Sequence, residues 1–439
     1  IVTLHGAVVH DSGGYGMLGF GHEPGPVRDA LAVRQVMANI MTGNVAQTRF
    51  VEALRREIGH SRCPPTGGGG DGESEPSSCP YDRFLCMNSG SEAMSVASRI
   101  SDAHAKRVTD DDDEDDGGTL AGTGTTSGTR RRHAGKTKCV YVALERGFHG
   151  RTLVPASFSD STRPHAERHL ASFRGWDNLW AVPANDVDAL RAAFVRAEAE
   201  GVFIQMVVIE PVQGEGEPGL AITREFYDEA RRLTLEHDAF FVVDSIQAGL
   251  RAWGTLSIVD YPGFEDCAPP DMEAWSKALN AGQFPLSVLG LTERAASEYV
   301  VGLYGNTMTT NPRALDVACA VLGMVTLEVR QNVRVQGHNF VDDLLRLKEE
   351  FPDIITEVRG TGLLFSVELN PDRARSLGAG SAEERCRMQG VGIIHGGKNA
   401  LRFTPHLCVT DLERELIVST LRSVLTEIEA ESKLSENNI

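Results

Sequence analysis

The chain has 439 residues, of which 41% are hydrophobic, and a formal net charge of −18 at pH 7. This length is too great for one ordinary hydrophobic core and predicts two domains. The acidic charge argues against nucleic-acid binding, which needs a basic face, and no apolar run reaches the ~20 residues that a membrane helix needs.

The eight cysteines contain no C-x-x-C pair, so we expect neither a bound metal nor a disulfide framework. We therefore expect a reducing compartment. Because the chain begins at Ile1 rather than at Met, both a cytoplasmic and a mitochondrial location stay open.

Two stretches have the composition of insertions. Residues 64–80 contain four consecutive glycines and several Ser and Pro residues, and residues 109–138 contain the acidic run 110–116 followed by Gly, Thr and Arg residues. Neither stretch can bury enough apolar surface to join a core, so we expect two flexible surface loops. The acidic run could instead be an interaction tail.

Strand and helix patterns alternate through the middle of the chain. Continuous apolar runs at residues 139–144, 207–209 and 240–243 are typical of strands buried on both faces. Between the last two runs we expect a helix that is capped by Thr223 and buries Phe226 on one face. A strand–helix–strand unit predicts an α/β domain whose mainly parallel sheet is covered by helices.

The C-terminal part has a different pattern. Thr410 and Glu413 form a capping box before a long helical repeat, and residues 363–369 alternate like a half-buried strand. We expect a smaller α+β domain that combines residues 1–46 with residues 331–439, next to a large domain of residues 47–330.

One lysine differs from the other six in its surroundings. Lys277 lies in an otherwise uncharged stretch, Ala-Trp-Ser-Lys-Ala-Leu. Apolar surroundings lower the pKa of an amine and make it a nucleophile toward aldehydes, although a surface lysine that lies along apolar neighbours fits this window equally well.

Two further features point to a ligand site, although each also has an ordinary structural explanation. Asp244 follows a buried strand at its carboxyl end, where ligands bind in open α/β sheets, but it could equally be a loop residue. The segment Asn-Ser-Gly-Ser-Glu-Ala at residues 88–93 places a glycine turn at a helix start, where backbone N–H groups can bind a phosphate.

Together these segments resemble the class III aminotransferases of fold type I, the family of ornithine, acetylornithine and 4-aminobutyrate aminotransferases. The matching segments follow the family order and span nearly the whole chain. They are residues 88–93, 148–152, 210–216, 244–247, 276–279, Thr307 with 311–312, 359–363 and 401–405. Each segment is weak evidence alone, but eight in order are difficult to explain otherwise.

The resemblance implies pyridoxal 5'-phosphate as the cofactor and a homodimer with sites at the interface. It assigns Lys277 to the Schiff base and to proton transfer, and Asp244 to the pyridine nitrogen, whose protonation makes the ring an electron sink. The other implied cofactor contacts are Gln247 to the ring hydroxyl, Phe148 to the ring face, Gly90 and Ser91 to the phosphate, and Thr307 to the phosphate of the neighbouring subunit.

The resemblance also implies substrate contacts. Arg402 is the expected carboxylate clamp, because a guanidinium binds a carboxylate through two parallel hydrogen bonds. Glu215 is expected to pair with Arg402 while the other substrate occupies the site. Tyr15 falls where ornithine-type enzymes place a substrate-contacting tyrosine, although a loop aromatic is an equally good interpretation.

Three positions depart from the family pattern: Ser245 replaces a glutamate, and Thr309 and Thr310 replace two glycines. We expect transfer of an amino group from an amine or ω-amino acid, ornithine-like, to a keto acid such as 2-oxoglutarate. Alternatives are an aminomutase, racemase or decarboxylase on the same fold, or a non-catalytic scaffold. The four groups Lys277, Asp244, Gln247 and Phe148 argue against a scaffold, which has no need of them.

Overall fold

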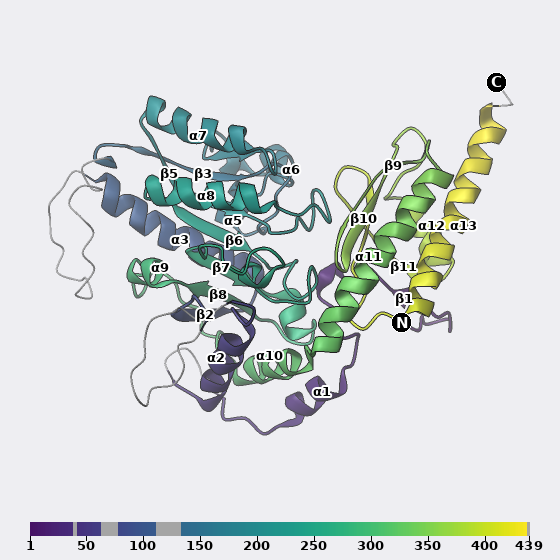
Figure 1. The fold of residues 1–439 in the computed structure, drawn as a ribbon, viewed down its shortest axis with the longest axis horizontal. Helices are drawn as coiled ribbons and strands as arrows, with labels where there is room; N and C mark the ends of the chain where they lie inside the picture. Colours follow the sequence, from purple (N-terminus) through teal and green to yellow (C-terminus); the bar gives the residue numbers. More distant parts are fainter. Residues whose placement is uncertain (38–41, 63–77, 111–132, 437–439) are drawn as a thin grey trace.

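The computed structural model describes residues 1–37, 42–62, 78–110 and 133–436. Most of the two expected insertions, residues 64–77 and 111–132, lies outside the described residues. Figure 1 shows two bodies side by side, one around a large twisted sheet and one around a smaller sheet flanked by long helices. The division expected after residues 46 and 330 stays a proposal. Within the described part, no helix is both long and apolar enough to cross a bilayer.

The large body is built on a seven-stranded sheet in the order β2-β8-β7-β6-β5-β3-β4, in which β8 runs opposite to the other six strands. Its strands are β2 (Arg83–Met87), β3 (Lys138–Leu144), β4 (Leu179–Val182), β5 (Val202–Ile209), β6 (Phe240–Asp244), β7 (Met272–Trp275) and β8 (Ser287–Leu291). Every residue of β5 and β6 is buried. The three strands expected from continuous apolar runs therefore lie within β3, β5 and β6.

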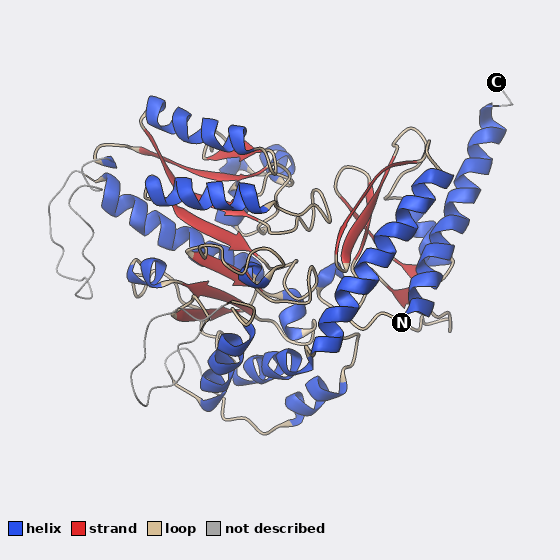
Figure 2. Ribbon diagram, viewed as in Figure 1, coloured by secondary structure: helices blue, strands red, loops and turns tan. Residues whose placement is uncertain are grey.

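Helices cover both faces of this sheet (Figure 2). Helix α3 (Gly90–Thr109) packs on one face against Met206, Val208 and Phe240. Helices α7 (Val187–Glu200) and α8 (Arg224–Glu236) pack on the other face, against alternate strand residues such as Val207. Alternate strand residues point to opposite faces, so apolar residues at every position give β5 a core on each side. Thr223 caps α8 as expected.

The second body has a four-stranded antiparallel sheet in the order β12-β13-β10-β9. Its elements are α11 (Leu327–Glu350), β9 (Ile355–Thr361), β10 (Leu364–Leu369), α12 (Ala382–Met388), β11 (Val391–Gly392), β12 (Ile394–Gly396), β13 (Ala400–Phe403) and α13 (Asp411–Glu436). Phe340, Phe365 and Phe403 stack between α11 and the sheet. Thr410 and Glu413 form the capping box expected at the start of α13.

The start of the N-terminal segment joins this second body. Strand β1 (His10–Asp11) pairs in parallel with β11, and the buried Arg251 side chain donates to the carbonyls of Gly16, Leu18 and Pro405.

The remaining elements are η1 (Gly14–Gly16), α1 (Gly25–Ala32), α2 (Val45–Glu57), α5 (Leu153–Ser157), α6 (Arg163–His169), η2 (Ala171–Phe173), η3 (Ile258–Asp260), η4 (Lys277–Asn280), α9 (Glu293–Ser297) and α10 (Pro312–Met324).

Candidate active site

A cavity of about 310 Å³ opens where the carboxyl end of β6 meets the first turn of α3 and the segment after β7. Ligands bind at this end of the strands in open α/β sheets. The cavity is lined by Gly90, Ser91, Phe148, His149, Gly150, Arg151, Glu210, Asp244, Ile246, Gln247, Ser276 and Lys277. It therefore brings together six residues that the sequence analysis assigned to a cofactor.

Lys277 begins the short helix η4, directly after β7 and Ser276. Its Nζ atom donates a hydrogen bond to Oε1 of Gln247. Burial, followed by the positive charge of Arg402, lowers the pKa of Lys277 to about 8. An amine with this pKa has lost its proton in about half of the molecules at pH 8, and the neutral amine can attack an aldehyde. Its backbone φ of 44° lies in the left-handed region, which is strained for a lysine.

Asp244 is the last residue of β6, and its carboxylate is 4% exposed. Its Oδ2 atom lies 2.8 Å from Nδ1 of His149, and its Oδ1 atom accepts from the Ile246 N–H at 3.1 Å. His149 is itself buried, so its ring orients the carboxylate toward the cavity. Sequence reasoning quoted His149 only as part of a motif and missed this role, because its contact with Asp244 joins residues 95 positions apart.

The start of α3 supplies the anion site. Ser89 caps the helix by accepting from the Glu92 N–H, and Glu92 in turn accepts from the Ser89 N–H. The next two N–H groups, of Gly90 and Ser91, have no acceptor within the helix because they belong to its first turn. Backbone N–H groups at such a position, with the positive end of the helix dipole, favour a phosphate.

Close packing fixes the position of this turn. A Cβ atom at Gly90 would lie 2.7 Å from Cδ1 of Ile246, so only glycine fits without displacing a side chain of the cavity wall. The Ser91 Oγ atom accepts from the Arg151 and Thr152 N–H groups at 3.0 Å each. These bonds hold the hydroxyl at the turn and leave its O–H group as a further donor beside the backbone N–H groups.

Phe148 lies on the cavity wall, where Oε1 of Glu210 accepts from its N–H at 2.9 Å. Burial raises the pKa of Glu210 to about 7. The guanidinium of Arg151 lies 5.3 Å from the Phe148 ring centre, over its face. Arg151 is exposed and lines the cavity, and sequence reasoning assigned it no role. The sequence did offer a signal for such a role, since Arg151 is an arginine close to residues assigned to the cofactor.

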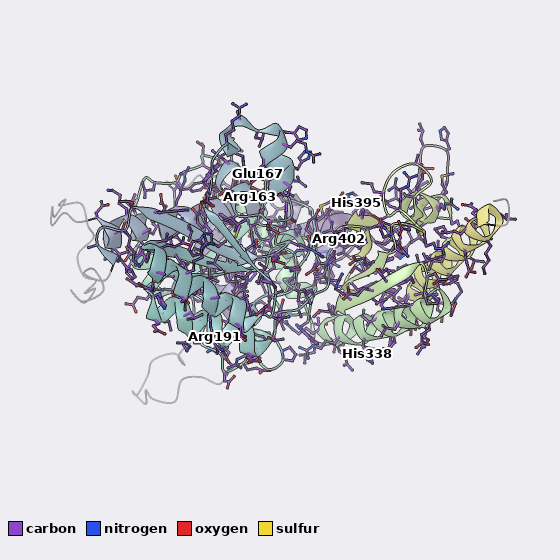
Figure 3. The ribbon with its side chains drawn as sticks, turned by 90° about the horizontal axis from the view of Figure 1, so that it is seen from above. Arg163, Glu167, Arg191, His338, His395 and Arg402 are labelled. Carbon is purple, nitrogen blue, oxygen red and sulfur yellow. The ribbon has the colours of Figure 1, made fainter. Side chains whose placement is uncertain are left out.

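Arg402, on β13, lies at the junction of the two bodies (Figure 3). Its side chain is fully buried, and its Nη1 atom donates to the Gly214 carbonyl and to Oε2 of Glu215 at 2.8 Å. The Gly214 carbonyl also accepts from Nε2 of Gln247 at 2.6 Å, which connects the arginine to the cavity. The Nε and Nη2 atoms of Arg402 are buried without a hydrogen-bond partner among the described residues.

Tyr15 and Thr307 differ in their placement. The Tyr15 ring lies 5.3 Å from the Arg402 guanidinium and is half exposed, so Tyr15 is beside the expected clamp. Thr307 is exposed on this chain and does not line the cavity. Its expected contact with a neighbouring subunit stays a prediction.

The departures from the family pattern are accommodated locally. Thr310 adopts a φ of 57°, the left-handed region that favours glycine. The Ser245 hydroxyl donates to the buried carboxylate of Glu273, which also accepts from the Tyr81 hydroxyl and the Ile258 N–H. None of the three departures, Ser245, Thr309 and Thr310, lines the cavity.

These donor and acceptor groups fit pyridoxal phosphate. The unpaired N–H groups of Gly90 and Ser91 suit its phosphate, the Asp244 carboxylate suits its pyridine nitrogen, and the Lys277 amine suits its aldehyde. The described residues thus offer one suitable group for each functional end of the cofactor.

Comparison with known proteins gives a consistent result. The family model described as aminotransferase class-III matches residues 13–425. The acetylornithine aminotransferase of Neisseria meningitidis serogroup A is 31% identical over 354 residues, which cover 80% of this chain and 78% of the relative. Ornithine aminotransferase 2 of Staphylococcus aureus is 33% identical over 288 residues, covering 65% of this chain and 67% of the relative.

Solved structures share the fold. The ornithine aminotransferase of Toxoplasma gondii superposes with a TM-score of 0.75 at 23% identity, covering 98% of this chain and 89% of that one. The N-acetylornithine aminotransferase of Stenotrophomonas maltophilia gives a TM-score of 0.69 at 24% identity, covering 98% and 93%. The predicted fold type I architecture is therefore confirmed, and the chain belongs to the class III aminotransferases, enzymes that use pyridoxal phosphate.

Proposed function

We propose that this enzyme transfers an amino group from an ω-amino acid or related amine, ornithine-like, to a dicarboxylate keto acid such as 2-oxoglutarate. The observation that carries the proposal is the pair of unpartnered, buried donors on Arg402, Nε and Nη2. A buried charged donor without a partner is costly, and these two atoms form one side of the guanidinium fork that binds a carboxylate. A substrate carboxylate would satisfy both.

Lys277 is the proposed acid–base group of both half-reactions. Bound pyridoxal phosphate supplies an electron sink for the substrate carbon that loses or gains a proton. The Nζ atom of Lys277 would accept this proton and donate it again, and its lowered pKa of about 8 suits a group that must do both near neutral pH. Its hydrogen bond to Gln247 orients the amine.

Glu215 is proposed to let one pocket accept two different substrates. While Glu215 pairs with Arg402 at 2.8 Å, the positive charge of the clamp is neutralised and an amine donor without a carboxylate at that position can bind. A dicarboxylate keto acid would bind the free Nε and Nη2 atoms, and the repulsion between its carboxylate and that of Glu215 would turn Glu215 away from Nη1. The Glu215 side chain is 25% exposed, so it can turn toward solvent at little cost.

Arg151 is a second proposed anchor. Its guanidinium makes only a ring contact with Phe148 among the interactions found in the described part of the chain. It lines the cavity next to the phosphate turn, where the Arg151 N–H donates to Ser91 Oγ at 3.0 Å. It is free to bind the α-carboxylate of an ω-amino acid donor. The names of the relatives, acetylornithine and ornithine aminotransferases, support a donor of this class.

The Arg402–Glu215 pair also favours transfer over the alternatives on the same fold. An aminomutase, racemase or decarboxylase completes its reaction on one substrate and needs no clamp that can be switched off. We further propose a homodimer in which Thr307 of the partner subunit reaches the phosphate, located in the cytoplasm or in mitochondria. Light scattering of the purified protein and the cofactor affinity of Thr307→Ala test the dimer.

The function is tested by following the visible absorption band of the bound cofactor. We expect ornithine, acetylornithine or 4-aminobutyrate to remove the band and 2-oxoglutarate to restore it. Lys277→Ala should abolish both changes. A band that forms in the wild-type protein and responds to no amine would overturn the proposal and favour an isomerase or decarboxylase.

A further inference from the structure

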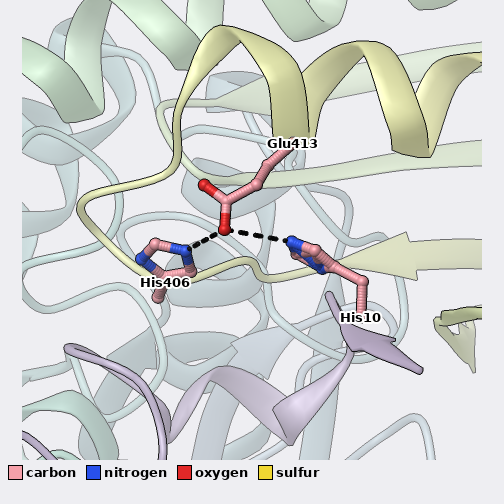
Figure 4. Close-up of side chains that lie close together, drawn as sticks. All are labelled: His10, His406 and Glu413. Carbon is pink, nitrogen blue, oxygen red and sulfur yellow. Dashed lines mark hydrogen bonds and ion pairs between the residues drawn. The ribbon is translucent and has the colours of Figure 1, made fainter. Parts of the chain in front are cut away.

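A second cluster of chemically active side chains lies outside the cofactor cavity. His10 on β1, His406 in the loop after β13 and Glu413 in the first turn of α13 meet at one point (Figure 4). One side-chain atom from each residue lies within 4.8 Å of the other two. These residues come from opposite ends of the chain, so only the tertiary fold brings them together.

The atoms that face one another are suited to a metal ion. Nε2 of His406 lies 3.0 Å and Nε2 of His10 lies 3.4 Å from the same oxygen, Oε1 of Glu413. Ligands of a tetrahedral zinc ion at 2.0–2.1 Å are roughly 3.3 Å apart. The two histidine–glutamate pairs already have nearly this spacing, and all three ligand atoms lie within 4.8 Å of one another, so an ion requires only modest movements of side chains.

The remaining atoms of two of these side chains are held by other partners. The second carboxylate oxygen of Glu413, Oε2, accepts from the N–H and the hydroxyl of Thr410, both at 2.8 Å. Nδ1 of His10 lies 3.3 Å from the hydroxyl of the buried Ser12. Such outer hydrogen bonds fix which atom of a ligand faces the metal, and here they direct Oε1 and Nε2 toward the same point.

His10 also has an unmet bonding need. Its Nε2 atom is buried and has no hydrogen-bond partner among the described residues, since the contact with Glu413 at 3.4 Å is not a hydrogen bond. A buried polar atom without a partner calls for an explanation such as an ion. A cavity of about 540 Å³ borders all three residues and leaves room for water to complete the coordination.

We propose that His10, His406 and Glu413 bind one divalent cation of the first transition row, of the zinc class. Two imidazoles and one carboxylate suit zinc and its neighbours, whereas calcium and magnesium prefer oxygen ligands alone. The expectation of no metal, which rested on the cysteine spacing, did not consider histidine and carboxylate ligands from distant parts of the chain.

The ion would fasten the N-terminal segment to the strand that carries the clamp. The Thr404 N–H donates to the Ser12 carbonyl at 2.7 Å, and the Gly16 N–H donates to the Thr404 hydroxyl at 3.1 Å. The metal site extends this contact by one further link, between His10 and His406. It is therefore a structural site, and its existence does not depend on which amine the enzyme uses.

The test uses the full-length enzyme with its cofactor bound, stripped of metal with a chelator. Co²⁺ is titrated in, and its d–d absorption is recorded at wavelengths longer than the cofactor band; Zn²⁺ is then added in competition. We expect one Co²⁺ per chain, displaced by Zn²⁺, and a higher thermal unfolding midpoint with Zn²⁺. His10→Gln and His406→Gln should each weaken binding at least about tenfold and remove the thermal shift.

Two variants serve as controls. His338→Gln removes an exposed histidine that pairs with Asp342 at 3.4 Å, and Cys408→Ser removes an exposed thiol near the site. Both should bind Co²⁺ like the wild type. Less than one Co²⁺ per chain, unchanged affinity in the folded His10 or His406 variants, or loss of binding in Cys408→Ser would overturn the proposal. If His10→Gln does not fold, His406→Gln decides alone.

Discussion

Replacing Arg402 by glutamine should damage one half-reaction far more than the other. The side chain is fully buried, and its Nε and Nη2 atoms are unpartnered. Each charge-assisted hydrogen bond from them to a substrate carboxylate contributes about 1.5–3 kcal/mol. Two such bonds contribute about 3–6 kcal/mol, and repulsion between Glu215 and the substrate carboxylate places the net near the lower end, about 3–4 kcal/mol. At about 1.36 kcal/mol per tenfold, kcat/KM for 2-oxoglutarate should fall roughly 10²- to 10³-fold.

The assay is stopped-flow spectroscopy of the cofactor band, with each half-reaction followed in a single turnover. The donor half-reaction of an ω-amino acid should fall much less, because the donor does not need this clamp. Arg402→Lys keeps the charge but loses the two-pronged geometry, so it should recover only part of the loss. Arg385→Gln, which removes a partly exposed arginine paired with Glu431, is the matched control. Equal losses in both half-reactions would refute the reasoning.

Three further predictions concern the cofactor pocket. Lys277 has a pKa lowered to about 8. The rate at which the cofactor-free enzyme captures pyridoxal phosphate should therefore rise as the pH increases through 8 and then level off. A rate that is independent of pH from 6 to 10 would contradict this prediction. Gly90→Ala places a Cβ 2.7 Å from Ile246 and should reduce stability or cofactor affinity by about 1–3 kcal/mol. Gly323→Ala is the control, because its Cβ meets nothing within 4 Å. Calorimetry should show no loss of stability or of cofactor affinity for this variant. Asp244→Asn removes the negative charge at the pyridine end and should lower the donor half-reaction rate roughly 10²- to 10³-fold; a rate within tenfold of wild type argues against its assignment.

Helices and strands could be predicted from the sequence where apolar runs or helix-capping residues gave a strong local signal. Continuous apolar runs indicated β3, β5 and β6 because a strand covered on both faces is apolar at every position. Cap residues located α8 and α13 for a similar reason, since Thr223 and Thr410 act on N–H groups only a few positions away. Such interactions are local and can therefore be read from the sequence alone.

The residues of the cofactor pocket were identified in the sequence because they occur in recognisable segments in a fixed order. What each side chain touches was decided only by the tertiary structure. His149 orients Asp244 across 95 positions, and Arg251 joins the carbonyls of residues 16, 18, 363 and 405. The spacing of these residues along the sequence does not predict such contacts.

The sequence by itself determined the composition of the strands, the helix starts and the set of chemical groups available for catalysis, because each depends on neighbours along the chain. Only the folded chain decided which donors of Arg402 remain unpaired and that His10 meets His406 and Glu413. Those facts depend on the packing of segments about 400 residues apart in the sequence, where small differences in position determine whether two atoms bond.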